Sequence, residues 1–597
     1  MTQWCHAVSD DSLSTVYSHG LNTDHWGAAL HFQSRLTPRV FVQVHETAGA
    51  SRLKVTPTLN KWKDQHSLLA ESSISFRPDL SLQIMGSHYT FIDKQSGTEN
   101  NIHTQMLGMG LTYTHKNFST PVLMGIKQDK RLQQSDIGFS YNIQMQVPRT
   151  QFGDYTHQFL GQLDGDILDR RKNHSRSIQY QVHRRFYQDT ADTLNLEYRD
   201  LRRDYYISRE GALESREDIS QSAENRLTYQ IGTKTYLYFL GRIALHQLKI
   251  SQVTGQATGL QRERNDIEML GSFRLCWQYT WMRGNFQFRH LAEDQNYKLT
   301  ESLPATPYQG SHLLRTPDNQ SSITSYLLKT QFPLGHTDTL SMTTQFQKFQ
   351  YDTPDDDNFD DRDELRWHLN ITHQHRFSSR LSMQTHLSTH MLHLVYIFGE
   401  KSADNNWTRI FRLNPELVWK PTSAIRWKQS VSVLANYVDY DFDTELTGIR
   451  SFLYRKYQLE DSLYIGCTAR AFALINYRLE MDENGKLIWN RWLEEKLIDR
   501  QSHTFSIQMD YVLRPGLHIR PGYTYYIRTG YRYISLPDDT QERKTHLNFQ
   551  SHGPLLKWVY HGRRIKLNFS AHTIRTKTLT VKRQIYTRLD FQMNWIL

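Results

Sequence analysis

A short stretch near the middle of the chain is unusually rich in carboxylates. Hard cations such as calcium take several carboxylate oxygens, and a run of this density supplies them. The stretch differs from an EF-hand loop, because it lacks the glycine at the sixth position and the glutamate at the twelfth. If it binds calcium, we expect Asp355, Asp357, Asp360 and Asp361 as ligands; the alternative is a solvated charged loop. Its acidic residues are Asp352, Asp355, Asp356, Asp357, Asp360, Asp361, Asp363 and Glu364.

Histidines and paired arginines form two further groups. Neutral imidazoles can bind a metal or line a contact with a haem protein, but the chain has 28 histidines, and polar lining is the alternative. Paired arginines attract phosphates. In a membrane protein they would either anchor the chain at lipid headgroups or make the lining of an internal channel, its lumen, attractive to anions. The histidines are His368, His373, His375, His386, His390 and His393, and the pairs are Arg170-Arg171, Arg184-Arg185, Arg202-Arg203 and Arg563-Arg564.

Catalytic motifs are missing from the sequence. There is no G-x-S-x-G, H-E-x-x-H, Walker loop or dinucleotide fingerprint, so we expect a protein that is not an enzyme. The cysteines Cys5, Cys276 and Cys467 are too far apart for a CxxC pair or a zinc knuckle. We expect no cofactor, apart from calcium if the acidic stretch binds it.

The composition limits the classes of protein further. The net charge of +10 is spread along 597 residues and forms no single basic patch, which argues against a nucleic-acid partner. No stretch approaches 18 consecutive apolar residues, so no transmembrane helix is expected. No signal peptide is visible in residues 1–25.

The elements that must carry these residues are strands, as the end of the chain shows. Ile585, Thr587 and Leu589 begin an apolar series at every second residue, and polar residues stand between them. A period of two predicts a strand with one apolar face, and the run exceeds the roughly 9–11 residues that a tilted transmembrane strand needs. The series ends in Phe591, Met593, Trp595 and Leu597.

The same alternation recurs along the chain, with short turns, such as Val147-Pro148-Arg149, alternating with long polar stretches, such as 128–134 and 252–265. Thirteen short turns predict about 26–28 strands, with both ends of the chain on the side of the short turns. After Pro515, apolar side chains share one face of a strand, and His518, Arg520, Arg528 and Arg532 share the other. We expect these four to face a lumen. A soluble solenoid or propeller would need a fixed-length repeat, and none is seen.

These features resemble a large outer-membrane β-barrel of a diderm bacterium. The final strand resembles the C-terminal signal that the barrel-assembly machinery recognises, with Leu597 where phenylalanine is usual. The expected fold is all-β: a single large antiparallel transmembrane β-barrel over residues 11–597, preceded by a periplasmic segment at 1–10. Strand-like alternation begins by about Trp26, and we expect no plug domain.

The resemblance implies a place in the outer membrane, with lipid around the wall, and a role as a channel or conduit. The alternative is a sheath that holds a periplasmic or lumen-filling partner, such as a multihaem cytochrome or a secretion component. The MtrB/PioB-like barrels, which sheathe such cytochromes, are similar in strand count and also lack a plug.

Overall fold

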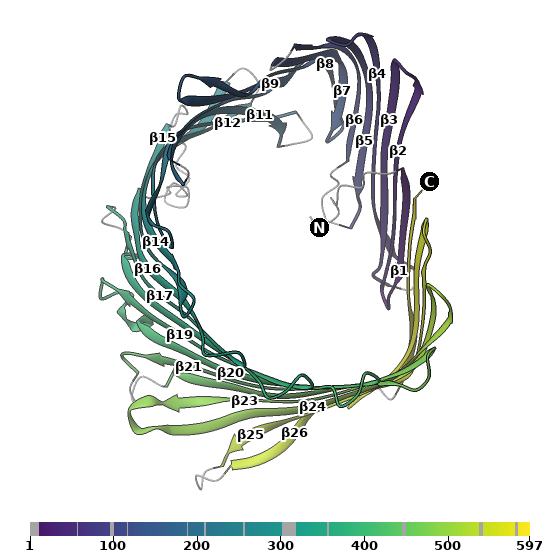
Figure 1. The fold of residues 1–597 in the computed structure, drawn as a ribbon, viewed down its shortest axis with the longest axis vertical. Helices are drawn as coiled ribbons and strands as arrows, with labels where there is room; N and C mark the ends of the chain where they lie inside the picture. The colour runs from purple at the N-terminus through teal and green to yellow at the C-terminus, as the bar shows by residue number, and fades with distance from the viewer. Residues whose placement is uncertain are drawn as a thin grey trace.

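The fold is a ring of long antiparallel strands (Figure 1). The computed structural model describes residues 11–56, 58–95, 101–115, 118–187, 189–207, 211–254, 257–300, 318–354, 358–443, 449–536, 541–579 and 583–596. The first half of the wall contains β1 (Ser12–His19), β2 (Thr23–Thr37), β3 (Val40–Lys54), β4 (Asn60–Arg77), β5 (Leu80–Asp93), β6 (Ile102–His115), β7 (Phe118–Arg131), β8 (Gln134–Phe152), β9 (Tyr155–Leu168), β10 (Lys172–Tyr187), β11 (Thr190–Tyr206), β12 (Leu213–Gly232), β13 (Thr235–Thr254) and β14 (Ala257–Gln278).

The second half continues in the same way, and its described loops contain two short 3-10 helices, η2 (Ser402–Asp404) and η3 (Trp489–Arg491). Its strands are β15 (Arg283–Thr300), β16 (Asn319–Pro333), β17 (Asp338–Asp352), β18 (Arg362–Arg376), β19 (Leu381–Tyr396), β20 (Asn406–Trp419), β21 (Ile425–Tyr440), β22 (Phe452–Gly466), β23 (Ala471–Ile488), β24 (Leu493–Arg514), β25 (Leu517–Ser535), β26 (Gln541–His561), β27 (Ile565–Thr578) and β28 (Gln584–Ile596).

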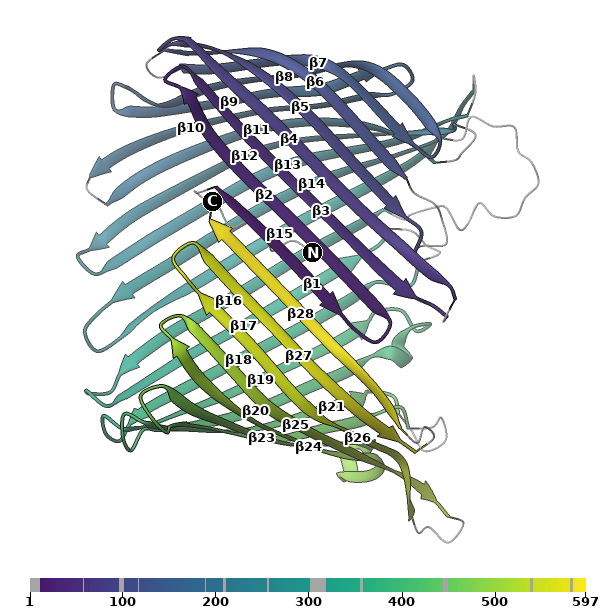
Figure 2. The same ribbon diagram turned by 90° about the vertical axis from the view of Figure 1, so that its right-hand side faces the viewer.

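The wall closes on itself. Each strand pairs antiparallel with its neighbours in the chain, and β1 pairs with β28 from Ser12 opposite Ile596 to His19 opposite Leu589. The 28 strands that the described residues form fall within the predicted number. Figure 2 shows the strands tilted across the wall, with β1 and β28 side by side at the seam. Closure matters because an open sheet edge would leave unpaired amide and carbonyl groups in lipid.

The two rims of the barrel differ. One has short turns, such as the one between Thr37 and Val40, and the described ends of the wall at Ser12 and Ile596 lie on this rim. The other carries the longer connections, yet several stretches predicted as loops are strand; β14, for example, starts at Ala257. Strands that project beyond lipid are wet on both faces, so the apolar period disappears while the backbone ladder continues.

One predicted turn, at Val147-Pro148-Arg149, is also wrong. These residues lie inside β8, where the register with β9 shifts between Val147 and Thr150. Proline has no amide hydrogen to donate, which suits a break in the ladder of this kind. The actual turn follows at Gly153, whose φ of +58° is costly for residues with a Cβ.

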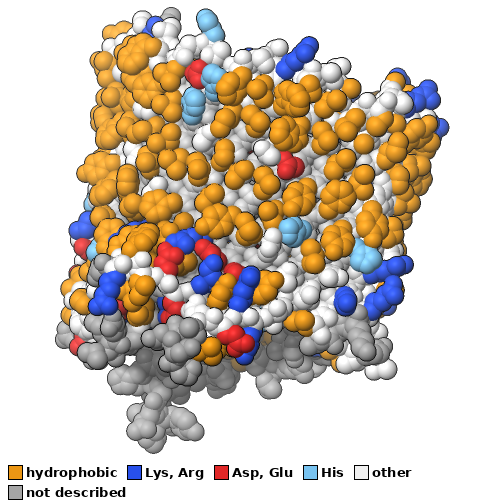
Figure 3. Space-filling view, turned by 90° about the horizontal axis from the view of Figure 1, so that it is seen from below, with side chains coloured by type: hydrophobic (Ala, Val, Ile, Leu, Met, Phe, Trp, Pro, Cys, Tyr) orange, Lys and Arg blue, Asp and Glu red, His pale blue; other side chains and the backbone are white. Residues whose placement is uncertain are grey.

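Alternation divides the side chains of the wall between an outer and an inner face. On β24, Phe505, Ile507, Met509, Tyr511 and Leu513 are 39%, 42%, 45%, 42% and 43% exposed. Figure 3 shows hydrophobic side chains spread over much of one outer face of the wall. Among the described residues, no helix is long and apolar enough to cross a membrane.

A small apolar cluster lies on the outer face where β21, β22 and β23 run toward the long loops. Leu487 is fully buried, and Leu453 and Tyr437 are 4% and 8% exposed. Trp489 of η3 packs against this cluster, and the guanidinium carbon of Arg409 lies 4.3 Å from the Trp489 ring centroid. The loop after β23 therefore folds back over the outside of the wall.

The closed ring predicts a cross-link between its first and last strands. In a variant with Cys5, Cys276 and Cys467 replaced by alanine, Ser14→Cys with Asn594→Cys joins residues directly opposite each other, at a Cβ separation of about 4.5–5.5 Å. We expect oxidation to form a disulfide, seen as a shift in denaturing gel mobility. Thr15→Cys with Met593→Cys samples the adjacent pair of the ladder.

The matched control is Ser14→Cys with Gln592→Cys, which is displaced by two residues, where Cβ atoms are roughly 7 Å apart and a disulfide does not form without backbone movement. Failure of both directly opposite pairs would contradict the closure of the wall.

Candidate binding site in the lumen wall

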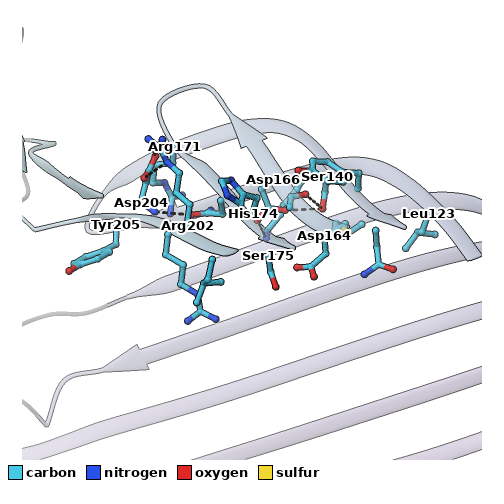
Figure 4. Close-up of a pocket in the computed structure, with 18 of the residues that line it drawn as sticks. Leu123, Ser140, Asp164, Asp166, Arg171, His174, Ser175, Arg202, Asp204 and Tyr205 are labelled. Carbon is cyan, nitrogen blue, oxygen red and sulfur yellow. Dashed lines mark hydrogen bonds and ion pairs between the residues drawn. The ribbon is translucent and has the colours of Figure 1, made fainter. Parts of the chain in front are cut away.

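A cavity of about 1170 Å³ lies against the wall formed by β4 to β12. Figure 4 shows that its lining is polar and charged, with Asp164, Asp166 and Ser175 among the labelled residues. The lipid-facing residues of β11, Leu194 and Leu196, are 37% and 41% exposed. Arg199 and Arg203 have the opposite parity on the same strand, which places them on the lumen face.

The wall beside this cavity depends on glycines that let strands approach closely. A Cβ on Gly110 of β6 would lie 2.1 Å from the carbonyl oxygen of Val122, and one on Gly125 of β7 would lie 2.3 Å from that of Leu107. Real side chains do not fit at such distances, so these positions require glycine. The close approach of β6 and β7 allows the wall to turn sharply next to the cavity.

A buried network of charges ties together the strand ends above the cavity. Arg171, in the turn after β9, donates to Asp136 (Nε to Oδ2, 2.7 Å) and to Asp129 (Nη2 to Oδ2, 2.9 Å). Tyr206, the last residue of β11, donates its hydroxyl to Asp136 at 2.8 Å. Arg171, Asp129 and Asp136 are 1%, 2% and 0% exposed. Three hairpin ends, β7–β8, β9–β10 and β11–β12, are therefore joined.

The charge state of Arg171 follows from this setting. Burial acts to lower its pKa, but the charges of Asp129 and Asp136 and its hydrogen bonds to them outweigh burial, so the pKa lies above the usual value for arginine. Arg171 thus remains a cation between two carboxylates. A buried charge keeps its place only when it is paired and hydrogen-bonded in this way.

The turn between β7 and β8 holds the two carboxylates of the network in position. Leu132 and Gln133 have φ angles of 47° and 70°, the left-handed pair that a two-residue type I′ hairpin turn needs. Neither residue is glycine, so the turn is strained. The sequence prediction treated residues 128–134 as a polar loop and therefore missed Asp129 and Asp136; no pattern in the sequence links them to Arg171 and Tyr206.

Of the four predicted calcium ligands, Asp355 and Asp357 lie outside the described residues. Asp360 forms an ion pair with Lys401, and Asp361 accepts hydrogen bonds from the backbone N–H and the hydroxyl of Thr353, at 2.7 and 2.6 Å. Both described carboxylates thus have protein partners. No group of three or more potential ligands suited to a metal occurs within the described part of the chain, and calcium binding stays a prediction.

The four residues predicted to face the lumen lie along β25. His518 and Arg520 both contact Asp510, at 2.9 and 3.0 Å, on the face of β24 opposite to exposed Met509 and Tyr511. Arg528 lies 3.9 Å from Asp482. Arg532 makes no ion pair or hydrogen bond with any described residue.

The final strand carries Phe591, Met593 and Trp595 on one face, and Trp595 is 39% exposed. Leu597 lies outside the described residues. Recognition of this strand by an assembly machinery stays a prediction.

The histidines predicted as a group are divided between the two faces of β18 and β19. His373 and His375 share the parity of exposed Trp367, and both contact Oδ1 of Asp338, at 3.0 and 2.6 Å. His386 has the opposite parity to exposed Leu387 and lies 2.9 Å from the hydroxyl of Thr372. Of the predicted arginine pairs, Arg202-Arg203 and Arg171 line the same cavity, whereas Arg184 lies over the Tyr155 ring.

Comparison with known proteins gives a likeness in solved structures only. No protein-family model and no curated protein matches the sequence. The FrpB iron transporter from Neisseria meningitidis is 9% identical, with a TM-score of 0.36 over 81% of this chain and 82% of that one. The copper transporter OprC is 6% identical (TM-score 0.40, 98% and 80%), and BauA, the ferric preacinetobactin receptor from Acinetobacter baumannii, is 7% identical (TM-score 0.38, 98% and 79%).

The chain forms a closed antiparallel β-barrel, as predicted. Its closed wall and apolar outer surface have the design of a transmembrane barrel.

The prediction of a barrel without a plug domain is corrected. The structure describes a closed all-β barrel over its described residues, and the predicted lack of a plug domain is not confirmed. The prediction rested on alternation that begins early in the chain. Alternation locates wall strands, but a plug is a separate globular unit on which the wall pattern gives no information.

Loss of Arg171 is expected to loosen the three joined hairpin ends. Arg171→Gln leaves Asp129 and Asp136 buried together without their shared cation, and breaking a buried pair costs about 3–5 kcal/mol. We expect faster hydrogen–deuterium exchange in the β9–β10 turn and at the end of β11, with the rest of the wall unchanged.

Arg170→Gln is the matched control. Arg170 contacts the same Asp136 but is 48% exposed, and pairs at exposed positions are worth about 0–1 kcal/mol. Equal exchange in the two variants would refute the role assigned to the buried network.

Proposed function

We propose that the protein is a conduit that carries polar material across the outer membrane through its lumen. The observation that supports this most directly is the closed 28-stranded wall, apolar outside and charged inside. Arg199, Asp164 and Asp510 are examples of the inner lining, which water or a polar solute can wet. The similar structures include an iron transporter and a copper transporter, which specify no substrate for this chain.

The width of the barrel favours a second candidate, a sheath around another protein. Strands about 4.8 Å apart and tilted by roughly 40° make a 28-stranded wall on the order of 55 Å across. A folded domain of about 100 residues has a radius of gyration near 13 Å, so it fits inside with room for side chains. The resemblance to MtrB/PioB-like barrels suggests a multihaem cytochrome as one such partner.

Planar-bilayer recording of the purified protein separates the two candidates. A conduit is expected to give large, steady conductance steps, because charged inner faces keep the lumen filled with water. A sheath purified with its partner is expected to give a closed trace and a second protein on a gel, with haem absorbance if that partner is a cytochrome. A closed trace without any partner would contradict both.

A further inference from the structure

The lumen face of β11 and β12 places like charges opposite each other. Arg203 of β11 is the direct cross-strand partner of Arg216 of β12, where Cβ atoms lie about 4.5–5.5 Å apart and like charges are destabilising. Arg199 has the same parity as Arg203, and all three line the cavity. Positions that break a local stability rule are expected at functional sites.

The carboxylates around these arginines have other partners. Asp166 binds Lys127 at 2.5 Å, Asp218 binds His246 at 2.6 Å, and Asp164 accepts a hydrogen bond from Gln162 at 3.1 Å. Two of these carboxylates also interact with the arginines, since the charges of Asp164 and Arg203 attract each other and Asp218 lies 3.7 Å from Arg216.

Arg199 and Arg203 form no hydrogen bond or salt bridge with the described part of the chain. Their side chains are exposed, and that of Arg216 is 51% exposed. Their guanidinium donors are therefore open to a solute in the cavity.

We propose that this cavity binds small solutes that carry more than one oxyanion group, phosphoryl or carboxylate. Guanidinium donors match both groups through paired hydrogen bonds. One group fits between Arg203 and Arg216. Arg199 lies four residues along the strand from Arg203, roughly 13 Å between Cα atoms, within reach of flexible side chains holding a second group. The inference rests on the proposed conduit and names the class of solute that it favours.

Calorimetric titration of the purified barrel in detergent tests the site without requiring conductance. The probes are inorganic pyrophosphate and citrate, which represent the phosphoryl and carboxylate classes. We expect Arg199→Gln/Arg203→Gln/Arg216→Gln to weaken binding at least tenfold. Binding of either probe supports the site and identifies its class, and binding of neither at millimolar concentration overturns it.

The control removes three lumen-facing cations on the far wall, where each has a carboxylate partner. Lys456 lies 3.0 Å from Glu480, Arg478 lies 2.5 Å from Glu460, and Arg528 lies 3.9 Å from Asp482. Lys456→Gln/Arg478→Gln/Arg528→Gln changes the net charge equally, and we expect less than a twofold effect. Equal weakening of probe binding in both triple variants would show that only the overall charge matters, which would overturn the proposed site.

The proposed conduit is tested by a separate measurement, the conductance of the protein in bilayers. In bilayers, the cavity variant is expected to shift the reversal potential in a salt gradient toward cation selectivity, and the control variant to shift it less. Pyrophosphate binding with no conductance would leave the oxyanion site standing and contradict the conduit. Conductance with no binding of either probe would support the conduit and contradict the oxyanion site.

Discussion

Satisfaction of backbone hydrogen bonds in lipid is the constraint on which this structure depends. A strand in hydrocarbon has no water to pair with its amide and carbonyl groups, so every strand needs two neighbours and the sheet must close. The pairing of β1 with β28 meets this requirement. Once the wall is closed, alternation assigns each side chain either to lipid or to the lumen, which gives a mean composition as polar as that of many soluble proteins.

The region around the cavity departs from a uniform cylinder and requires special residues. Gly110 and Gly125 allow strands to approach where no side chain fits. The Asp129–Arg171–Asp136 network fixes the hairpin ends above, and its buried charges give specificity of position more than net stability. A fixed corner of this kind holds the arginines of β11 and β12 in a constant geometry, which a site for a small solute needs.

Much of the wall could be predicted from the sequence, because the pattern of side chains directly reflects lipid on one side and water on the other. The faces of β24 and β28 and the number of strands followed from it. The extent of strands beyond the membrane could not be predicted, since both faces of β14 near Ala257 meet water and no period remains. The buried network could not be predicted from the sequence either, because Arg171 and Tyr206 contact Asp136 only after three hairpins have folded. The plug is a question that wall alternation cannot address.

The seam has a mechanical consequence. Among the described residues, β1 contributes only eight residues to its ladder with β28, whereas β13 and β14 are matched over about twenty. Strand β1 is matched to β2 over eight residues as well, so its two ladders have the fewest rungs among the described strands. Lateral tension in the bilayer will therefore separate the wall first on one side or the other of β1. A small molecule leaving sideways into the lipid would meet its lowest barrier beside this strand.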